Sequence, residues 1–193
     1  MKIRTIASLL AACAALSGCA HMINITPPLN TISGEGITRS NKVVGYYISA
    51  EQRARLVTTP GGGGDKVSYK PYAEAEPALN QMLQNLYAQV IPLGSMTDAA
   101  IADKHIAFVF TPDIQTTSSS SSALTWPPTN FTITIVCKAT DPAGASAWQG
   151  SVTGTGVAEY SEFKHDFSLA ARRAAKDGFN KLQAKLAEAG ELH

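Results

Sequence analysis

The chain has 193 residues, a formal net charge of +1, and 45% hydrophobic against 16% charged residues. This length fits one domain of ordinary size with processing segments, and the composition excludes wholesale disorder. Removal of a segment holding Lys2 and Arg4 would leave a net charge of about −1 and no basic stripe, so nucleic acid is not an expected partner.

The first residues have the organisation of a secretory signal. Lys2 and Arg4 precede an uncharged run from Ile6 to Leu16. A charged head with a short apolar body is typical of an export signal, and the run is shorter than the roughly 20 apolar residues of a transmembrane helix. We therefore expect residues 1–18 to be removed.

The run ends in Leu16-Ser17-Gly18-Cys19, which resembles the lipobox of bacterial lipoproteins. The resemblance implies that Leu16, Ser17 and Gly18 are recognised by the signal peptidase, and that Cys19 carries a diacylglyceryl group with further acylation. Anchoring to the membrane through Cys19 follows, and Ala20 behind it implies the periplasmic side of the outer membrane. The alternative is an ordinary signal peptide cut at a small-residue site.

The segment after Cys19 lacks any periodic pattern. Pro27, Pro28, Gly34 and Gly36 interrupt it. We predict a flexible tether over residues 19–41, with one short extended piece near residues 22–26, and a single periplasmic domain over residues 42–190.

Hydrophobic periodicity predicts the elements of this domain. Five segments alternate as strands do, and two have helical spacing. The strands are expected near residues 43–48, 65–69, 106–116, 131–138 and 147–160, and the helices near 73–90 and 168–187, with a short helical turn at 50–55. The order favours an α+β fold, with an antiparallel sheet of about four to five strands and two helices packed on one face.

No pattern points to catalysis, to a cofactor or to a metal. The glycines at 61–64 are followed by Asp65 and Lys66 and by a strand, whereas a phosphate loop opens a helix. The four histidines are not spaced as metal ligands, and His165-Asp166 has no Gly-x-Ser-x-Gly partner. Cys137 alternates with strand residues, which favours a buried small side chain over a reactive thiol.

Two clusters could contact a partner. Leu124 and Trp126 are large apolar residues in a Ser- and Pro-rich loop, where they could either anchor a partner or fold back over the sheet. The four tyrosines Tyr46, Tyr47, Tyr69 and Tyr72 could line a groove or cap the edge of the core.

The order of elements resembles that of small envelope lipoproteins, including YajG-like proteins and the auxiliary lipoproteins of lipid-transport ABC systems. The resemblance rests on the lipobox, the early strand, the helix near residues 78–90, the 105–160 meander and the closing alanine-rich helix. Neither family offers a catalytic residue to carry over. The lipid anchor, the long tether and the lack of a catalytic constellation lead us to expect a non-enzymatic accessory component, which docks on another envelope protein through a sheet edge or the Trp126 loop. A lipid- or ligand-binding module of a transporter, with a cavity between the first helix and the sheet, is the alternative; an envelope enzyme is a third hypothesis.

Overall fold

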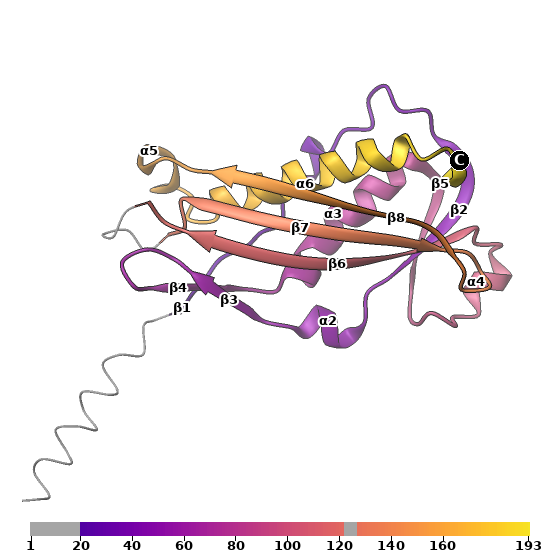
Figure 1. Cartoon of the computed structure of the whole chain (residues 1–193), viewed down its shortest axis with the longest axis horizontal. Coiled ribbons are helices and arrows are strands. Elements are labelled where there is room, and N and C mark those ends of the chain that lie inside the picture. The colour runs from indigo at the N-terminus through magenta and orange to yellow at the C-terminus, as the bar shows by residue number, and fades with distance from the viewer. Residues whose placement is uncertain (1–19, 122–126) are drawn as a thin grey trace, which may run out of the picture.

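The computed structural model describes residues 20–121 and 127–193. Its elements form one five-stranded sheet, one small three-stranded sheet and two long helices (Figure 1). The strands are β1 Ala20–Met22, β2 Ser40–Tyr47, β3 Val57–Pro60, β4 Lys66–Tyr69, β5 Tyr87–Leu93, β6 Phe108–Ser119, β7 Asn130–Thr140 and β8 Ser146–Val157. The helices are α2 Ala50–Ala54, α3 Pro71–Leu86, α4 Ala100–Asp103, α5 Tyr160–Phe163 and α6 Leu169–Ala187, with 3-10 turns at Leu29–Thr31 and Gly190–Leu192.

The predicted α+β class is confirmed, but the large sheet is mixed. Its order is β5-β2-β6-β7-β8. The β6-β7-β8 meander is antiparallel as expected, whereas β2 pairs in parallel with both β5 and β6. The parallel pairs arise because α3 and the segment around α4 carry the chain back across the sheet between these strands.

The strand β5 corrects the predicted end of the first helix. The periodicity extended that helix to Val90, but α3 ends at Leu86 and the chain continues directly as β5. Val90 lies opposite Val44 of β2. Pairing with β2 outweighs the helical spacing here, because a short apolar run fits either element when its partner is not known.

Helices α3 and α6 cover one face of the large sheet (Figure 1). Alternate residues of β7 face them and are fully buried, whereas the residues between them are half-buried or exposed on the other face. Four large side chains in the second half of α3 meet this core and are at most 1% exposed: Leu79, Met82, Leu83 and Leu86. They belong to the same continuous core as Phe110 and Ile133.

The interior between α3 and the sheet is therefore filled by side chains. The hypothesis of a lipid- or ligand-binding module required an apolar cavity there. This filled core opposes that hypothesis.

Residues 19–41 were predicted to form a flexible tether, but residues 20–37 pack on the domain. Ile25 is 0% and Ile32 is 2% exposed. The amide of Asn85 on α3 donates to Ile32 O at 3.0 Å, and that of Gln183 on α6 donates to Ser33 O at 2.7 Å. The segment thus crosses both helices from outside. Its isoleucines, and not its proline content, decide its conformation, because each one buried gains roughly 1.5–3 kcal/mol.

Candidate functional site

The N-terminal end of the domain lies directly behind the predicted lipidation site. Ala20, His21 and Met22 form β1, which pairs in parallel with Lys66, Val67 and Ser68 of β4. The N–H of Ile23 then donates to Ser68 O at 3.1 Å. The predicted recognition residues Leu16, Ser17 and Gly18, and Cys19 itself, lie outside the described residues.

Residues 24–26, which follow β1, are also hydrogen-bonded to the domain. The N–H of Ile25 donates to Glu74 Oε2 at 2.8 Å, and the hydroxyl of Thr26 donates to Glu74 O at 2.8 Å. Asn24 N–H donates to Ser168 Oγ at 3.1 Å, which places this segment beside the start of α6. Only one peptide bond separates Cys19 from the first residue of the folded domain.

The glycine run at 61–64 forms the hairpin between β3 and β4. Gly61 N–H donates to Asp65 O at 2.9 Å, and Gly63 and Gly64 take positive φ values of 66° and 87°. Asp65 lies 3.3 Å from His21 Nε2 across the β1–β4 pair. The glycines therefore make a tight turn, and the hairpin lies next to β1.

The two tyrosines predicted as partner contacts point to opposite faces of the sheet. Tyr46 is 4% exposed and belongs to the main core under the helices. Tyr47 is half-buried on the other face, in a small cluster around Leu93, Ile106 and Val109. They do not line a common groove, because neighbouring residues of a strand alternate between faces. Leu124 and Trp126 lie outside the described residues.

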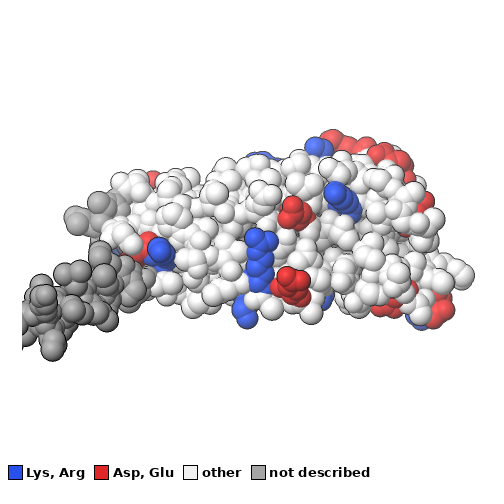
Figure 2. All heavy atoms as spheres, turned by 60° about the horizontal axis from the view of Figure 1, so that its bottom comes forward, with Lys and Arg blue, Asp and Glu red and all other residues white. Residues whose placement is uncertain are grey.

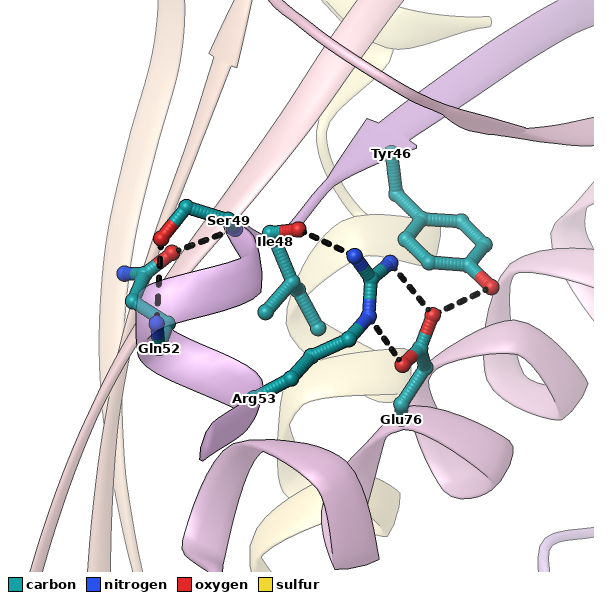
Figure 3. A network of polar contacts seen from close by, with 6 residues as sticks. All are labelled: Tyr46, Ile48, Ser49, Gln52, Arg53 and Glu76. Carbon is teal, nitrogen blue, oxygen red and sulfur yellow. Dashed lines mark hydrogen bonds and ion pairs between the residues drawn. The ribbon is translucent and has the colours of Figure 1, made fainter. Parts of the chain in front are cut away.

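The hydroxyl of Tyr46 takes part in a network that fastens α2 to α3 (Figure 3). Arg53 on α2 donates to Glu76 on α3 through Nε at 2.7 Å and through Nη2 at 2.8 Å. Its Nη1 donates to Ile48 O at 2.6 Å, and Tyr46 donates to Glu76 Oε1 at 3.1 Å. The Glu76 side chain is 21% exposed and that of Arg53 is 34% exposed.

This network has a structural role. The hydrogen bonds from Arg53 lower the pKa of Glu76, and burial raises the pKa of Tyr46 to about 12, with the Glu76 carboxylate adding to the rise. A carboxylate held ionised by a bidentate guanidinium, and a phenol held neutral, do not titrate near neutral pH. Ser49 begins α2 with a capping box to Gln52.

Among the residues that the structure describes, the free cysteine is buried. Cys137 is 0% exposed, and burial raises the pKa of its thiol to about 12, which agrees with the predicted small core residue. Across residues 20–121 and 127–193, no cluster of three or more His, Cys, Asp or Glu side chains could hold a metal ion. Over the same residues no helix is long and apolar enough to cross a bilayer.

A row of charged side chains on α6 covers the outer edge of β8, a feature that the sequence analysis missed. Four residues spaced by four positions meet backbone groups of the edge strand. The contacts are Arg173 Nη1 to Val157 O at 2.7 Å, Thr155 N to Asp177 Oδ2 at 2.9 Å, Lys181 Nζ to Thr153 O at 3.0 Å and Lys185 Nζ to Ser151 O at 3.3 Å. We call these four residues of α6 the edge ladder.

Glycines in β8 allow α6 to come this close. A Cβ atom on Gly154 would lie 2.3 Å from Ala174 O, and one on Gly156 would lie 2.0 Å from Ala170 O. The spacings also match, since four helical residues rise about 6 Å and two strand residues about 6.7 Å. The recurrence of basic and acidic residues at 173, 177, 181 and 185, together with the β8 glycines, was the available sequence signal.

No family model matches the sequence, and no curated protein matches it. Several solved structures are similar. A Xanthomonas campestris protein of family DUF330 is 11% identical with a TM-score of 0.48, over 89% of this chain and 92% of that one. A candidate lipoprotein of Caulobacter crescentus CB15 is 12% identical with a TM-score of 0.40, over 82% and 91%. The PelC dodecamer of Paraburkholderia phytofirmans is 16% identical with a TM-score of 0.45, over 80% of this chain and 92% of that one. These likenesses do not assign the chain to a family.

Proposed function

We propose that this protein is a lipoprotein anchored through an acylated Cys19, and that it serves as a non-catalytic accessory component of an envelope complex. The observation that carries the proposal is Leu16-Ser17-Gly18-Cys19, placed behind a charged head and an apolar run and directly before the folded domain at Ala20. Two or three acyl chains on one residue would hold the domain at a bilayer durably, since one chain alone binds only marginally.

The anchor is tested by metabolic labelling with a palmitate analogue. The wild-type chain and Cys137→Ala should incorporate the label and fractionate with membranes, whereas Cys19→Ser should do neither. Cys137 is the matched control because its thiol is buried. Label on Cys19→Ser, or full membrane retention of that variant with the same mature N-terminus as the wild type, would contradict the anchor.

The outer membrane is proposed as the destination because Ala20, and not an aspartate, follows Cys19. Ala20 is exposed at the start of β1, so its side chain can be changed without disturbing the core. In a bacterium with two membranes, Ala20→Asp should move the protein to the inner-membrane fraction, while Ala20→Ser should not. An unchanged distribution of Ala20→Asp would contradict this destination.

The accessory role rests on the anchor and on the sequence, which offers no catalytic motif. It predicts a stoichiometric protein partner after mild solubilisation of the membrane. Crosslinking in intact cells followed by purification under denaturing conditions should recover the same partner. The absence of any stoichiometric partner in several detergents and after crosslinking would contradict the role.

A further inference from the structure

We propose that the end of the domain that carries β1 rests directly on the lipid bilayer, in a fixed orientation. The inference deepens the proposed function and rests on the acylation of Cys19. It concerns the surface formed by Met22, Val157 and Phe167 together with the β3–β4 hairpin, which we call the proximal end. The occupant of this surface is the lipid headgroup region of the bilayer.

The first argument is that no flexible residues separate the expected anchor at Cys19 from the folded domain. Ala20 is already paired with Lys66 in β1, and successive Cα atoms are about 3.8 Å apart. A free tether of about 22 residues would instead span roughly 25 Å. The contacts of Ile23, Ile25 and Ile32 remove that freedom. An acylated Cys19 would therefore hold β1 at the depth of the lipid headgroups.

The second argument is which parts of the chain share this end. Figure 1 places the β3–β4 hairpin, the last residues of β6 and β8 and the short helix α5 at the end where residue 20 enters the fold, and the C-terminus at the opposite end. Contacts agree with the picture. Ser118 of β6 donates to Pro60 O of the hairpin at 2.5 Å, and Asn130 pairs with both Ser119 and Val157.

The third argument is the kind of side chain exposed there. Met22 is 65% exposed, Val157 is 51% exposed and Phe167 is 46% exposed. Phe167 neighbours Ser168, whose hydroxyl accepts from Asn24 next to β1. In the view of Figure 2, oppositely charged side chains lie beside the grey residues, and the surface between them and the middle of the molecule carries few others. Apolar side chains of this size enter the boundary between headgroups and acyl chains, about 5–10 Å deep.

The experiment uses the full, acylated protein reconstituted in phosphatidylethanolamine and phosphatidylglycerol vesicles. Single cysteines replace Val157, Phe167 or Met96 and carry a fluorophore, and brominated lipids report contact with the bilayer. Cys137 is buried and so does not compete for the label. Met96, which is 40% exposed, is the control because it lies between β5 and α4, at the end opposite β1.

We expect brominated lipids to quench the probes at Val157 and Phe167 and to leave the probe at Met96 unchanged. Equal emission changes at all three positions would overturn the inference, as would no change at any of them, which is the result if a protein and not a lipid covers this end. Mass spectrometry of the same sample separates the two proposals. A chain without acyl groups contradicts the anchor, whereas an acylated chain without quenching contradicts only the orientation.

A second variant tests the cause of the orientation. A flexible Gly-Ser linker inserted between Ala20 and His21 preserves the lipobox and the residue behind Cys19. Quenching at Val157 and Phe167 should then be lost, while acylation and membrane retention persist. Undiminished quenching in this variant would overturn the role of the short connection.

Discussion

At the scale of single residues, polar groups in the core differ sharply in whether they have partners. Tyr72 donates to Asp113 Oδ1 at 3.0 Å and accepts from the Ile114 N–H at 3.2 Å. Tyr87 is 0% exposed, and among the described residues its hydroxyl has no hydrogen-bond partner. Its ring packs on Phe110 and stacks on His193. Tyr87 therefore contributes to the core through its ring, while its hydroxyl is unpaired.

Because only one of the two hydroxyls has partners, removing the hydroxyl of Tyr72 and that of Tyr87 should have different effects on the free energy of unfolding. Tyr87→Phe should leave the free energy of unfolding unchanged or raise it by about 1 kcal/mol, because it removes an unsatisfied buried group. Tyr72→Phe should lower it by about 1–2 kcal/mol, because Ile114 N–H and Asp113 lose a partner. Urea denaturation of the two variants measures both. A loss for Tyr87→Phe equal to that for Tyr72→Phe would contradict the unpaired state of Tyr87.

Glu76 makes stability depend on pH on the acid side. Its pKa is lowered in the folded chain by the hydrogen bonds from Arg53, so its contribution is complete above the unfolded-state pKa of about 4.3 and is lost as the pH falls through the folded value. Glu76→Gln should lower the unfolding free energy at pH 7 by about 1 kcal/mol, a small loss because Arg53 is a third exposed. The free energy of unfolding of Glu76→Gln should also fall less steeply than that of the wild type as the pH is lowered.

Denaturation curves at pH 7 and at stepwise lower pH measure this effect. Glu51→Gln is the matched control, since Glu51 is an exposed acid on the neighbouring helix α2. An acid limb equally steep in Glu76→Gln and in the wild type would exclude Glu76 as its source.

At the scale of elements, the two edges of the large sheet are protected in different ways. The edge strand β5 contains the exposed Pro92, which has no N–H to offer a further strand. The edge strand β8 is covered by the edge ladder of α6. Uncovered strand edges template pairing with other chains, so both devices oppose association through the sheet.

The edge ladder predicts a gain of self-association when it is removed. The triple variant Arg173→Ala/Asp177→Ala/Lys181→Ala removes the hydrogen-bond partners of three backbone groups of β8. The edge of β8 can then pair with the β8 edge of a second copy of the chain. Light scattering coupled to size exclusion should show a higher, concentration-dependent mass for the soluble domain. Lys176→Ala removes the same net charge from an exposed position of α6 and should not change the mass. Equal masses in both variants would contradict edge protection.

At the scale of the whole molecule, the packing of residues 20–37 sets the distance between the domain and the expected anchor at Cys19. If these residues were flexible the domain could move away from the anchor, and because they are packed it lies next to it. Ile25→Ala should lower the free energy of unfolding by about 2–4 kcal/mol, because a fully buried isoleucine is truncated. Leu29→Ala, at a side chain 38% exposed, should cost well under about 1 kcal/mol. Thermal and urea unfolding measure both variants. An unchanged free energy of unfolding for Ile25→Ala would contradict the packing of residues 20–37 and favour the flexible tether.

The predictable part of this fold was local. Periodicity located α2, α6, β7 and β8 within a few residues, and alternation placed Cys137 in the core, because these features depend on neighbours in the chain. The end of α3 and the strand β5 were missed, since pairing with β2 decides them. Four tyrosines were grouped as one groove or core edge, although Tyr46, Tyr69 and Tyr72 lie in the main core and Tyr47 lies on the other face of the sheet.

The sequence alone determined the α+β class, the order of most elements and the expectation of an anchor at Cys19, since each depends on a short run of residues read in order. Only the tertiary structure decided that residues 20–37 pack across α3 and α6, that the core beneath α3 is filled, and that α6 covers the edge of β8. These features join residues far apart in the chain, such as Asn24 with Ser168 and Lys181 with Thr153. Long-range contacts are formed by packing and leave little trace in local pattern.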